Sequence, residues 1–294
     1  ILIRSSKSSQ LPSRGIRVSP AHEALMPKIL TPNTQPALTT TTSGVASGWW
    51  ITGVEVSVTP TYDTRYIQYG LVRLGSTGST QNTLAEVPTD IVLDRVYIHG
   101  LVDTPTSRCV ELNSGRTQIS DSYLAECHVK GFDSQAILGW NGPGPFKIVN
   151  NMLMGDTENV MFGGSDPTIP GLIPSDIEMR GNYLYTPASW GANMANKLWT
   201  KKNLFELKSA RRVLFEGNIL DGSWSDAQKG MGVLIRTTNQ GGACTWCQTS
   251  DVTIRYNLMR NMPGVFDVVG NEPTKPTGGP VTNLLIEHNI YENI

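Results

Sequence analysis

The sequence repeats one eight-residue pattern that is centred on an asparagine. Around Asn218, apolar residues stand five and three positions before the asparagine and two positions after it, at Val213, Phe215 and Leu220. Four further asparagines have the same surroundings: Asn151, Asn182, Asn257 and Asn289. Three earlier segments keep the frame without the asparagine, and their equivalent residues are Val54, Val96 and Ser122. A fold of this chain must therefore provide eight similar places for these eight segments.

The spacing within the pattern predicts a short strand that ends in a bend. Two apolar residues at a spacing of two indicate a strand with one buried face. The spacing then breaks by one residue at the asparagine, so the chain has to turn there to keep its apolar groups inside. Asparagine tolerates the left-handed conformation that a tight bend needs, and its amide can bond to its neighbours. Stacked repeats would place these amides in a ladder.

Each copy of the pattern follows another short apolar strand, so every repeat contains about three strands. The clearest of these upstream strands are 71–75, 109–113, 160–164, 204–208, 233–237 and 266–270. No segment shows the periodicity of an amphipathic helix, which argues against a helical solenoid. The hairpin signals that a β-propeller needs are also missing. The pattern predicts an all-β, single-stranded, right-handed parallel β-helix of eight or nine coils, stacked about 4.8 Å apart in one domain over residues 1–294.

The composition excludes some classes of function. Charged residues make up 17% of the chain and the net charge is -1, which argues against a nucleic-acid-binding protein. No apolar run approaches the roughly 18 residues of a transmembrane helix. The chain begins within an expected strand at Ile1 and ends within a repeat at Ile294, so we expect further sequence at both ends. A signal peptide is expected outside this range.

Four cysteines leave several possibilities open. Cys244 and Cys247 form a CTWC motif, which suits half of a zinc site, a redox pair or a small disulfide loop. In a β-helix, Cys109 and Cys127 would lie about four coils, or about 19 Å, from that motif. We therefore expect no metal shared by all four. Two separate disulfides or buried free thiols remain as alternatives.

Several long strings in the sequence are specific enough to indicate a family. They are DSQAILGWNGPGPFKIVNN (133–151), PSDIEMRGNYLY (174–185), KNLFELKSARRVLFEGN (202–218) and RTTNQGG (236–242). Through its repeats the chain resembles the pectate-lyase-like superfamily of right-handed β-helices. Through these strings it is more similar to a group of bacterial exported β-helix proteins that are described by their fold. The resemblance spans nearly the whole chain and implies a carbohydrate ligand.

The characterised enzymes of that superfamily carry motifs that this chain lacks. The Arg-x-Pro-x-x-Arg frame of pectate lyases is absent, and so is the Asn-Thr-Asp, Asp-Asp and Gly-His-Gly set of polygalacturonase-like hydrolases. The resemblance therefore implies a class of ligand and no particular mechanism.

Alternation along the upstream strands predicts which polar side chains leave the core. Glu206 and Lys208 should point outward from one strand, with Arg236 and Asp267 on the next two coils. Lyases of uronic acids need a cation to offset the sugar carboxylate and a base to remove the adjacent proton. Lys208 and Arg236 suit these two roles, and Glu206 or Asp267 would orient them. The alternative is a solvated ladder of ion pairs that contributes little to stability.

Tryptophans concentrate in the loops of the central coils. Exposed indole rings beside a groove would stack on sugars, and the expected substrate-binding residues are Trp140, Asn141, Trp190, Trp199 and Trp224. Alternatively, these rings fold the long loops onto the coil. A calcium site would require the loops to bring Asp166, Asp176 and Asp226 together.

Two hypotheses of function follow from these observations. The first is a secreted, extracellular or periplasmic enzyme that binds and cleaves an acidic polysaccharide by β-elimination, with glycoside hydrolysis as its second form. The alternative is a non-catalytic extracellular module that binds a surface glycan or builds an assembly by end-to-end self-association.

Overall fold

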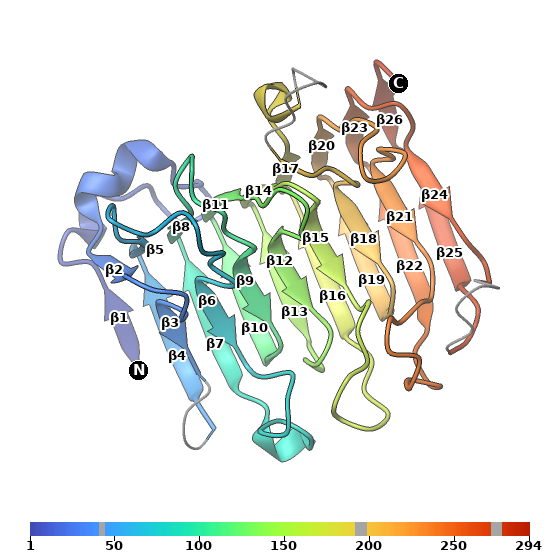
Figure 1. The fold of residues 1–294 in the computed structure, drawn as a ribbon, viewed down its shortest axis with the longest axis horizontal. Helices are drawn as coiled ribbons and strands as arrows, with labels where there is room; N and C mark the ends of the chain where they lie inside the picture. The colour runs from blue at the N-terminus through green and yellow to red at the C-terminus, as the bar shows by residue number, and fades with distance from the viewer. Residues whose placement is uncertain (41–44, 192–198, 272–277) are drawn as a thin grey trace.

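The chain forms a right-handed parallel β-helix in which successive coils add strands to three parallel sheets (Figure 1). The structure is a computed structural model that describes residues 1–40, 45–191, 199–271 and 278–294. Over these residues, sheets A and B contain nine strands each and sheet C contains eight. The predicted all-β solenoid is confirmed. None of the helices in the described ranges is long and apolar enough to cross a membrane.

Each sheet takes every third strand of the chain. Sheet A consists of β1 (Leu2–Arg4), β4 (Ser47–Thr52), β7 (Thr89–Asp94), β10 (Gly115–Ser120), β13 (Phe146–Val149), β16 (Ser175–Arg180), β19 (Ala210–Glu216), β22 (Thr249–Arg255) and β25 (Thr282–Glu287). Sheet B consists of β2 (Lys28–Thr31), β5 (Glu55–Val58), β8 (Tyr97–His99), β11 (Tyr123–Cys127), β14 (Met152–Gly155), β17 (Tyr183–Tyr185), β20 (Ile219–Asp221), β23 (Leu258–Arg260) and β26 (Ile290–Glu292). Sheet C consists of β3 (Leu38–Thr39), β6 (Val72–Leu74), β9 (Arg108–Leu112), β12 (Gln135–Gly139), β15 (Glu158–Phe162), β18 (Phe205–Leu207), β21 (Val233–Ile235) and β24 (Phe266–Val268). Short 3-10 helices lie in the connections: η1 (Ser8–Gln10), η2 (Pro20–Leu25), η3 (Leu84–Glu86) and η4 (Ala188–Trp190).

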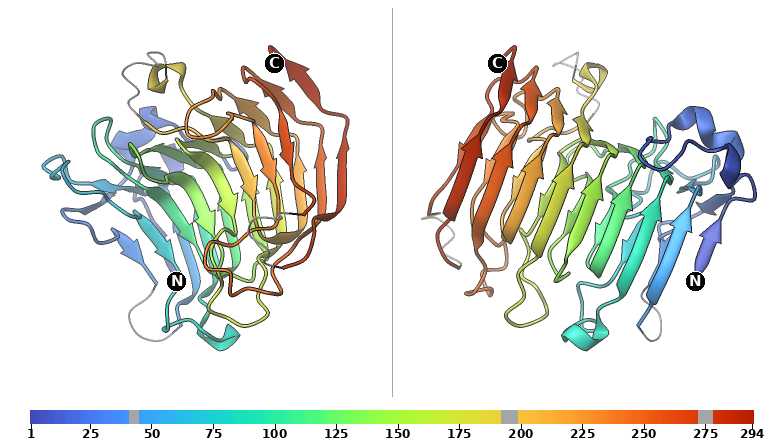
Figure 2. Two further views of the ribbon diagram at one scale, coloured as in Figure 1. Left: turned by 45° about the vertical axis from the view of Figure 1, so that its right-hand side comes forward. Right: turned by 180° about the vertical axis from the view of Figure 1, so that it is seen from behind.

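The interior is a column of apolar side chains that runs along the stack. Equivalent residues of successive coils pair in register, so that Ile177 lies beside Val213 and Val213 beside Val252. These side chains belong to one continuous buried cluster that extends over the described coils. Figure 2 shows the same stacking of strands from two further sides, with the chain termini at opposite ends. The apolar positions of the repeat thus face inward, as the spacing predicts.

The five repeated asparagines form a ladder at the corner between sheets A and B. The side-chain amides donate to one another over 3.0 Å (Asn151 to Asn182), 2.9 Å (Asn182 to Asn218), 3.1 Å (Asn218 to Asn257) and 2.8 Å (Asn257 to Asn289). Each amide also donates to a carbonyl of the preceding coil, as Asn218 does to Met179 at 3.0 Å. Ser122 continues the ladder, because its main-chain N–H donates to Asn151 Oδ1 at 3.0 Å. The predicted ladder is confirmed.

The bend at this corner lies one residue earlier than the sequence pattern suggested. The residue with positive φ precedes the ladder position in every repeat, and these residues are Gly53, Arg95, Asp121, Asn150, Gly181, Gly217, Tyr256 and His288. The ladder asparagines themselves are absent from the residues with positive φ. The asparagine therefore supplies hydrogen bonds to the corner, while its neighbour adopts the left-handed conformation. Glycine at three of these positions fits that requirement.

The four cysteines form two disulfides, which was one of the alternatives left open by the sequence. Cys109 pairs with Cys127 inside the core, with Cα atoms 5.8 Å apart. Cys244 pairs with Cys247 within the CTWC loop, with Cα atoms 5.4 Å apart. All four sulfur atoms are thus bonded in pairs.

Replacing Asn218 with Leu should lower the free energy of unfolding by about 1–3 kcal/mol, because it leaves buried partners on both adjacent coils without a hydrogen bond. Urea unfolding followed by circular dichroism measures this change. Asn82→Leu is the control, since Asn82 is exposed and, among the described residues, its side-chain amide donates only to Ser79. Equal stability of the two variants would contradict a structural role for the ladder.

Candidate functional site

Sheet C brings the four predicted catalytic residues together on three adjacent strands, β18, β21 and β24. Glu206 lies in the middle of β18, and Lys208 follows the end of that strand. Arg236 follows β21, and Asp267 lies in the middle of β24. The register pairs Glu206 with Leu234 and Leu234 with Asp267, so the outward side chains of these three coils form one column.

Two ion pairs connect these residues. Lys208 Nζ lies 2.8 Å from Glu206 Oε1, and Arg236 lies 3.5 Å from Asp267 Oδ2. Asn203 Nδ2 donates to the other oxygen of Glu206 at 2.8 Å. Each cation therefore has its own carboxylate, as expected if Glu206 and Asp267 orient Lys208 and Arg236.

The outer face of sheet C is more covered than the sequence predicted. The side chain of Glu206 is 0% exposed and that of Lys208 is 12% exposed, so the prediction of a solvated face is wrong for this pair. The apolar members of the column, Leu138, Met161 and Leu234, are also buried. The loop after β15 explains part of this cover, because a Cβ on Gly164 would lie 2.3 Å from Met161 Cε and 3.2 Å from Lys208 Cδ. Arg236 and Asp267 remain partly exposed, at 22% and 27%.

A second carboxylate and its lysine extend this site, and sequence reasoning missed both. Glu158, at the start of β15, is buried and accepts a hydrogen bond from Gln135 Nε2 at 2.6 Å. Lys202 Nζ lies 3.5 Å from Glu158 and also pairs with Asp133. The expected strand began at residue 160, so Glu158 stood outside it. The observed strand starts two residues earlier. We call Glu158, Lys202, Glu206 and Lys208 the sheet C cluster.

The two buried carboxylates of the sheet C cluster have pKa values that move in opposite directions. Burial raises the pKa of Glu158 to about 7, and the nearby charge of Glu206 adds to this effect. Burial also acts to raise the pKa of Glu206, but Lys208 and Asn203 outweigh it and lower that pKa below its usual range. Glu206 is therefore ionised at neutral pH, while Glu158 exchanges its proton near neutrality.

Another buried charge lies at the corner between sheets B and C. Lys201 is buried, and its Nζ donates to Thr186 Oγ1 and to the carbonyl of Asn203, both at 2.8 Å. Burial lowers the pKa of Lys201 to about 8. Burial raises the pKa of Asp156 well above its usual value, and no hydrogen bond reaches its carboxylate in the described structure. This pair adds to the unusual density of buried charge around β15 and β18.

Three of the predicted sugar-binding tryptophans pack over sheet B and not over sheet C. Trp190 is buried against Met152 and Met154 of β14 in a cluster that Trp199 and Trp224 contact. The ring of Trp199 stacks on His128 with centroids 3.8 Å apart. These rings fold long loops onto the coil, which was the alternative explanation. The expectation that they wall the sheet C site is wrong.

Trp140 and Asn141 follow the end of β12, at the same edge of sheet C as Lys208 and Arg236, which follow β18 and β21. The side chain of Asn141 is buried and makes five hydrogen bonds with Ser76, Gln81, Thr168 and Ile169. Its amide is therefore committed to holding three loops together. The ring of Trp140 is partly exposed beside it.

The three aspartates considered for calcium lie in separate surroundings. Asp166 accepts the N–H groups of Ala243 and Cys244, Asp176 pairs with Arg212, and Asp226 accepts the N–H of Lys201. In the described parts of the chain, no group of three acidic, histidine or cysteine side chains could hold a metal ion. The loops thus do not assemble the calcium site that the sequence suggested.

Comparison with known proteins adds little to this picture. No protein-family model and no curated protein matches the sequence. Among solved structures, the fold is similar to the Dettilon tailspike protein, with a TM-score of 0.40 and 9% identity over 84% of this chain and 61% of that chain. The chain thus spans less than two thirds of the length of that tailspike protein, and a likeness this distant carries no information about the site. The resemblance to the pectate-lyase-like superfamily stays a prediction, whereas the β-helix is confirmed by the strand order.

Replacing Lys208 with Ala should lower the free energy of unfolding by about 3 kcal/mol, because it leaves the charge of Glu206 buried without its cation. Urea unfolding measures the change, and the double variant Glu206→Gln/Lys208→Met should recover most of it. Arg65→Ala, which removes the exposed partner of Asp63, is the control and should stay close to the parent. Equal stability of Lys208→Ala and the parent would show that Glu206 is not held as an ion.

Proposed function

We propose that the protein binds an acidic polysaccharide along the edge of sheet C where Lys208 and Arg236 lie. The observation that carries this proposal is the repetition of a partly exposed cation, held by its own carboxylate, at the same place on adjacent coils. Leu207 pairs with Ile235, so the two cations follow neighbouring strands that are about 4.8 Å apart. A row of fixed cations suits a polymer that carries a carboxylate on successive sugars.

The buried carboxylates serve this site by orienting its cations. A lysine on a flexible stem loses entropy when it binds a ligand, and a prior ion pair with Glu206 reduces that loss. Glu206 cannot contact a polymer itself, because its side chain is fully buried. The same burial argues against glycoside hydrolysis by Glu158 and Glu206, since hydrolysis requires both carboxyl groups to flank the sugar bond.

Cleavage by β-elimination is the enzymatic form of this proposal. Lys208 first loses its ammonium proton to water and then, as the neutral amine, takes the proton from the carbon next to the uronate carboxylate, while Arg236 stays charged and steadies that carboxylate. The C–O bond to the leaving sugar then breaks, a carbon–carbon double bond forms, and the leaving oxygen takes up a proton from water. Glu206 and Asp267 orient the side chains of Lys208 and Arg236 during this step. A non-catalytic glycan-binding module would bind the polymer at the same edge but would not cleave it.

Two further features support a protein that works outside the cytoplasm. Both cysteine pairs are disulfides, which persist in oxidising compartments. An extracellular or periplasmic location also suits a polysaccharide ligand.

Binding and cleavage can be tested on polygalacturonate, with neutral galactan as the comparison polymer. The parent should bind polygalacturonate in affinity electrophoresis, with weaker binding at high salt, and should not bind galactan. Arg236→Gln and the double variant Glu206→Gln/Lys208→Met should each weaken binding by at least about tenfold, because each removes a charge-assisted contact. Arg255→Ala, on the outer side of sheet A, is the charge-matched control.

Ultraviolet absorbance of the unsaturated product separates an enzyme from a binding module. Absorbance that rises with the parent and not with Arg236→Gln supports elimination. Binding without any rise supports the module. A parent that binds neither polymer overturns the proposal.

The affinity for polygalacturonate should fall as the pH rises from about 6 to about 8, because Glu158 ionises in this range and adds negative charge beneath the cations. The uronate carboxylates stay ionised throughout. Glu158→Gln should remove this pH dependence and keep the tighter binding, whereas Glu178→Gln in sheet A should retain it. Affinity electrophoresis at several pH values provides the measurement. An unchanged pH profile in Glu158→Gln would show that Glu158 does not act on the binding edge.

A further inference from the structure

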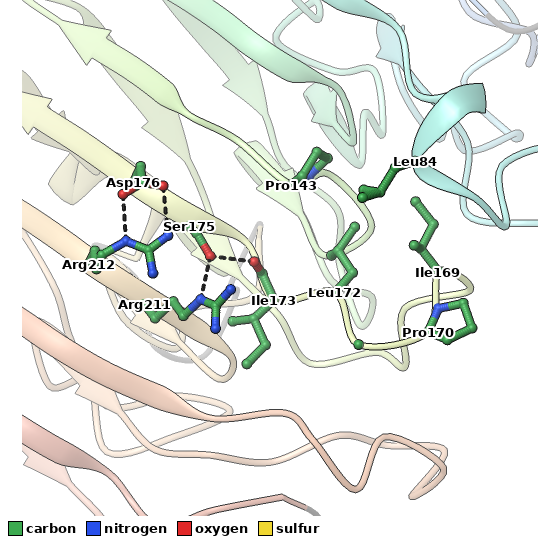
Figure 3. Close-up of a pocket in the computed structure, with 11 residues that line it drawn as sticks. Leu84, Pro143, Ile169, Pro170, Leu172, Ile173, Ser175, Asp176, Arg211 and Arg212 are labelled. Atoms are coloured by element: carbon green, nitrogen blue, oxygen red, sulfur yellow. Dashed lines mark hydrogen bonds and ion pairs between the residues drawn. The ribbon is translucent and has the colours of Figure 1, made fainter.

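A separate cleft lies around the corner from the sheet C cluster, where sheet C leads into sheet A (Figure 3). Its volume is about 200 Å³, and its walls come from η3, from the turn at Pro143, from the loop after β15 and from the first residues of β16 and β19. The walls are mostly apolar, and their side chains are Leu84, Pro143, Ile169, Pro170, Leu172 and Ile173.

Two arginines line this cleft, and they differ in their partners. Arg212 binds both oxygens of Asp176, at 2.6 and 2.8 Å, so its charge is matched. Arg211 donates from Nε to Ser175 Oγ at 3.0 Å, and Ser175 in turn donates to the carbonyl of Ile173. In the described structure, no acceptor bonds to the two terminal nitrogens of Arg211, and no carboxylate lies within ion-pair distance of them. Figure 3 shows its Nε directed to Ser175 and the guanidinium fork beyond.

We propose that this cleft binds one carboxylated sugar, with the carboxylate on the terminal nitrogens of Arg211. The fixed, planar fork of arginine suits a carboxylate through two parallel hydrogen bonds, and the bond to Ser175 holds the fork in place. The apolar walls suit the C–H face of a sugar ring. A cleft of about 200 Å³ suits a single sugar ring.

The position of Arg211 connects the cleft with the proposed binding edge. Lys208 and Arg211 are three residues apart on one coil, so their Cα atoms are separated by no more than about 11 Å. The loop after β15 passes Lys208 at Gly164 and then supplies Ile169 to Ile173 of the cleft wall. The cleft would therefore hold a further acidic sugar of the same polymer. Only this last step rests on the proposed function, because binding of a single sugar by Arg211 requires no cleavage.

Titration of sodium galacturonate by isothermal calorimetry tests the cleft, with galactose as the neutral comparison. The parent should bind galacturonate and not galactose. Arg211→Met should weaken the binding of galacturonate by at least about tenfold. Arg211→Lys keeps the charge and removes the fork, so its affinity for galacturonate should lie between those of the parent and Arg211→Met. Binding by this variant shows that a change at position 211 does not unfold the protein. Arg255→Ala should bind like the parent.

The double variant Glu206→Gln/Lys208→Met separates this proposal from the previous one. It should bind galacturonate like the parent even where it fails to bind the polymer. If instead the double variant loses galacturonate and Arg211→Met keeps it, the sugar binds at the edge of sheet C and the cleft proposal is wrong. Equal binding by the parent and Arg211→Met, equal binding of galactose, or no binding by the parent also overturns it. Loss of galacturonate binding in Arg211→Met and not in the double variant supports the cleft, whether or not the polymer is cleaved.

Discussion

Parallel main-chain hydrogen bonding between successive coils is the interaction on which the rest of this structure depends. Because paired strands keep a fixed spacing of about 4.8 Å, each side chain lies beside the equivalent side chain of the next coil. Apolar residues therefore line the interior in columns, and asparagines form a ladder at one corner. The same rule places Glu206, Leu234 and Asp267 in one outward column. The site is thus a consequence of coil register, and a shift by one residue would send its charges into the core.

The sequence predicted the fold well because its repeat records this register directly. Apolar positions around Asn151, Asn182 and Asn218 all face inward, and the asparagines stack as expected. The predicted position of the bend is wrong by one residue. Asparagine tolerates positive φ, so it was assigned that conformation, whereas the preceding residue adopts it. Gly181 and Gly217 stand at that preceding position and were the available signal.

The candidate site was less predictable, because alternation determines which side chains leave the core but not what covers them. Glu206 does point away from the interior, yet it is fully buried on the outer side of sheet C. The cover comes from loops of irregular length, such as the one that places Gly164 against Lys208, and no repeat specifies their path. Trp199 shows the same limit, since no repeat specifies its stacking on His128. Arg211 escaped notice because what distinguishes it from Arg212 is the lack of a carboxylate partner, which only coordinates reveal.

The burial of charge on sheet C also bears on whether this face has a function. Exposed pairs such as Arg116 and Asp90 on sheet A require little desolvation and contribute little to stability. The pairs of the sheet C cluster are largely removed from water, and apolar side chains of similar size often replace such pairs without loss of stability. Leu138 and Met161 show that apolar residues fit the same outward column. Stability alone therefore does not account for Glu206 and Lys208, whereas the proposed role, a cation held at a fixed place for an anionic ligand, would account for them.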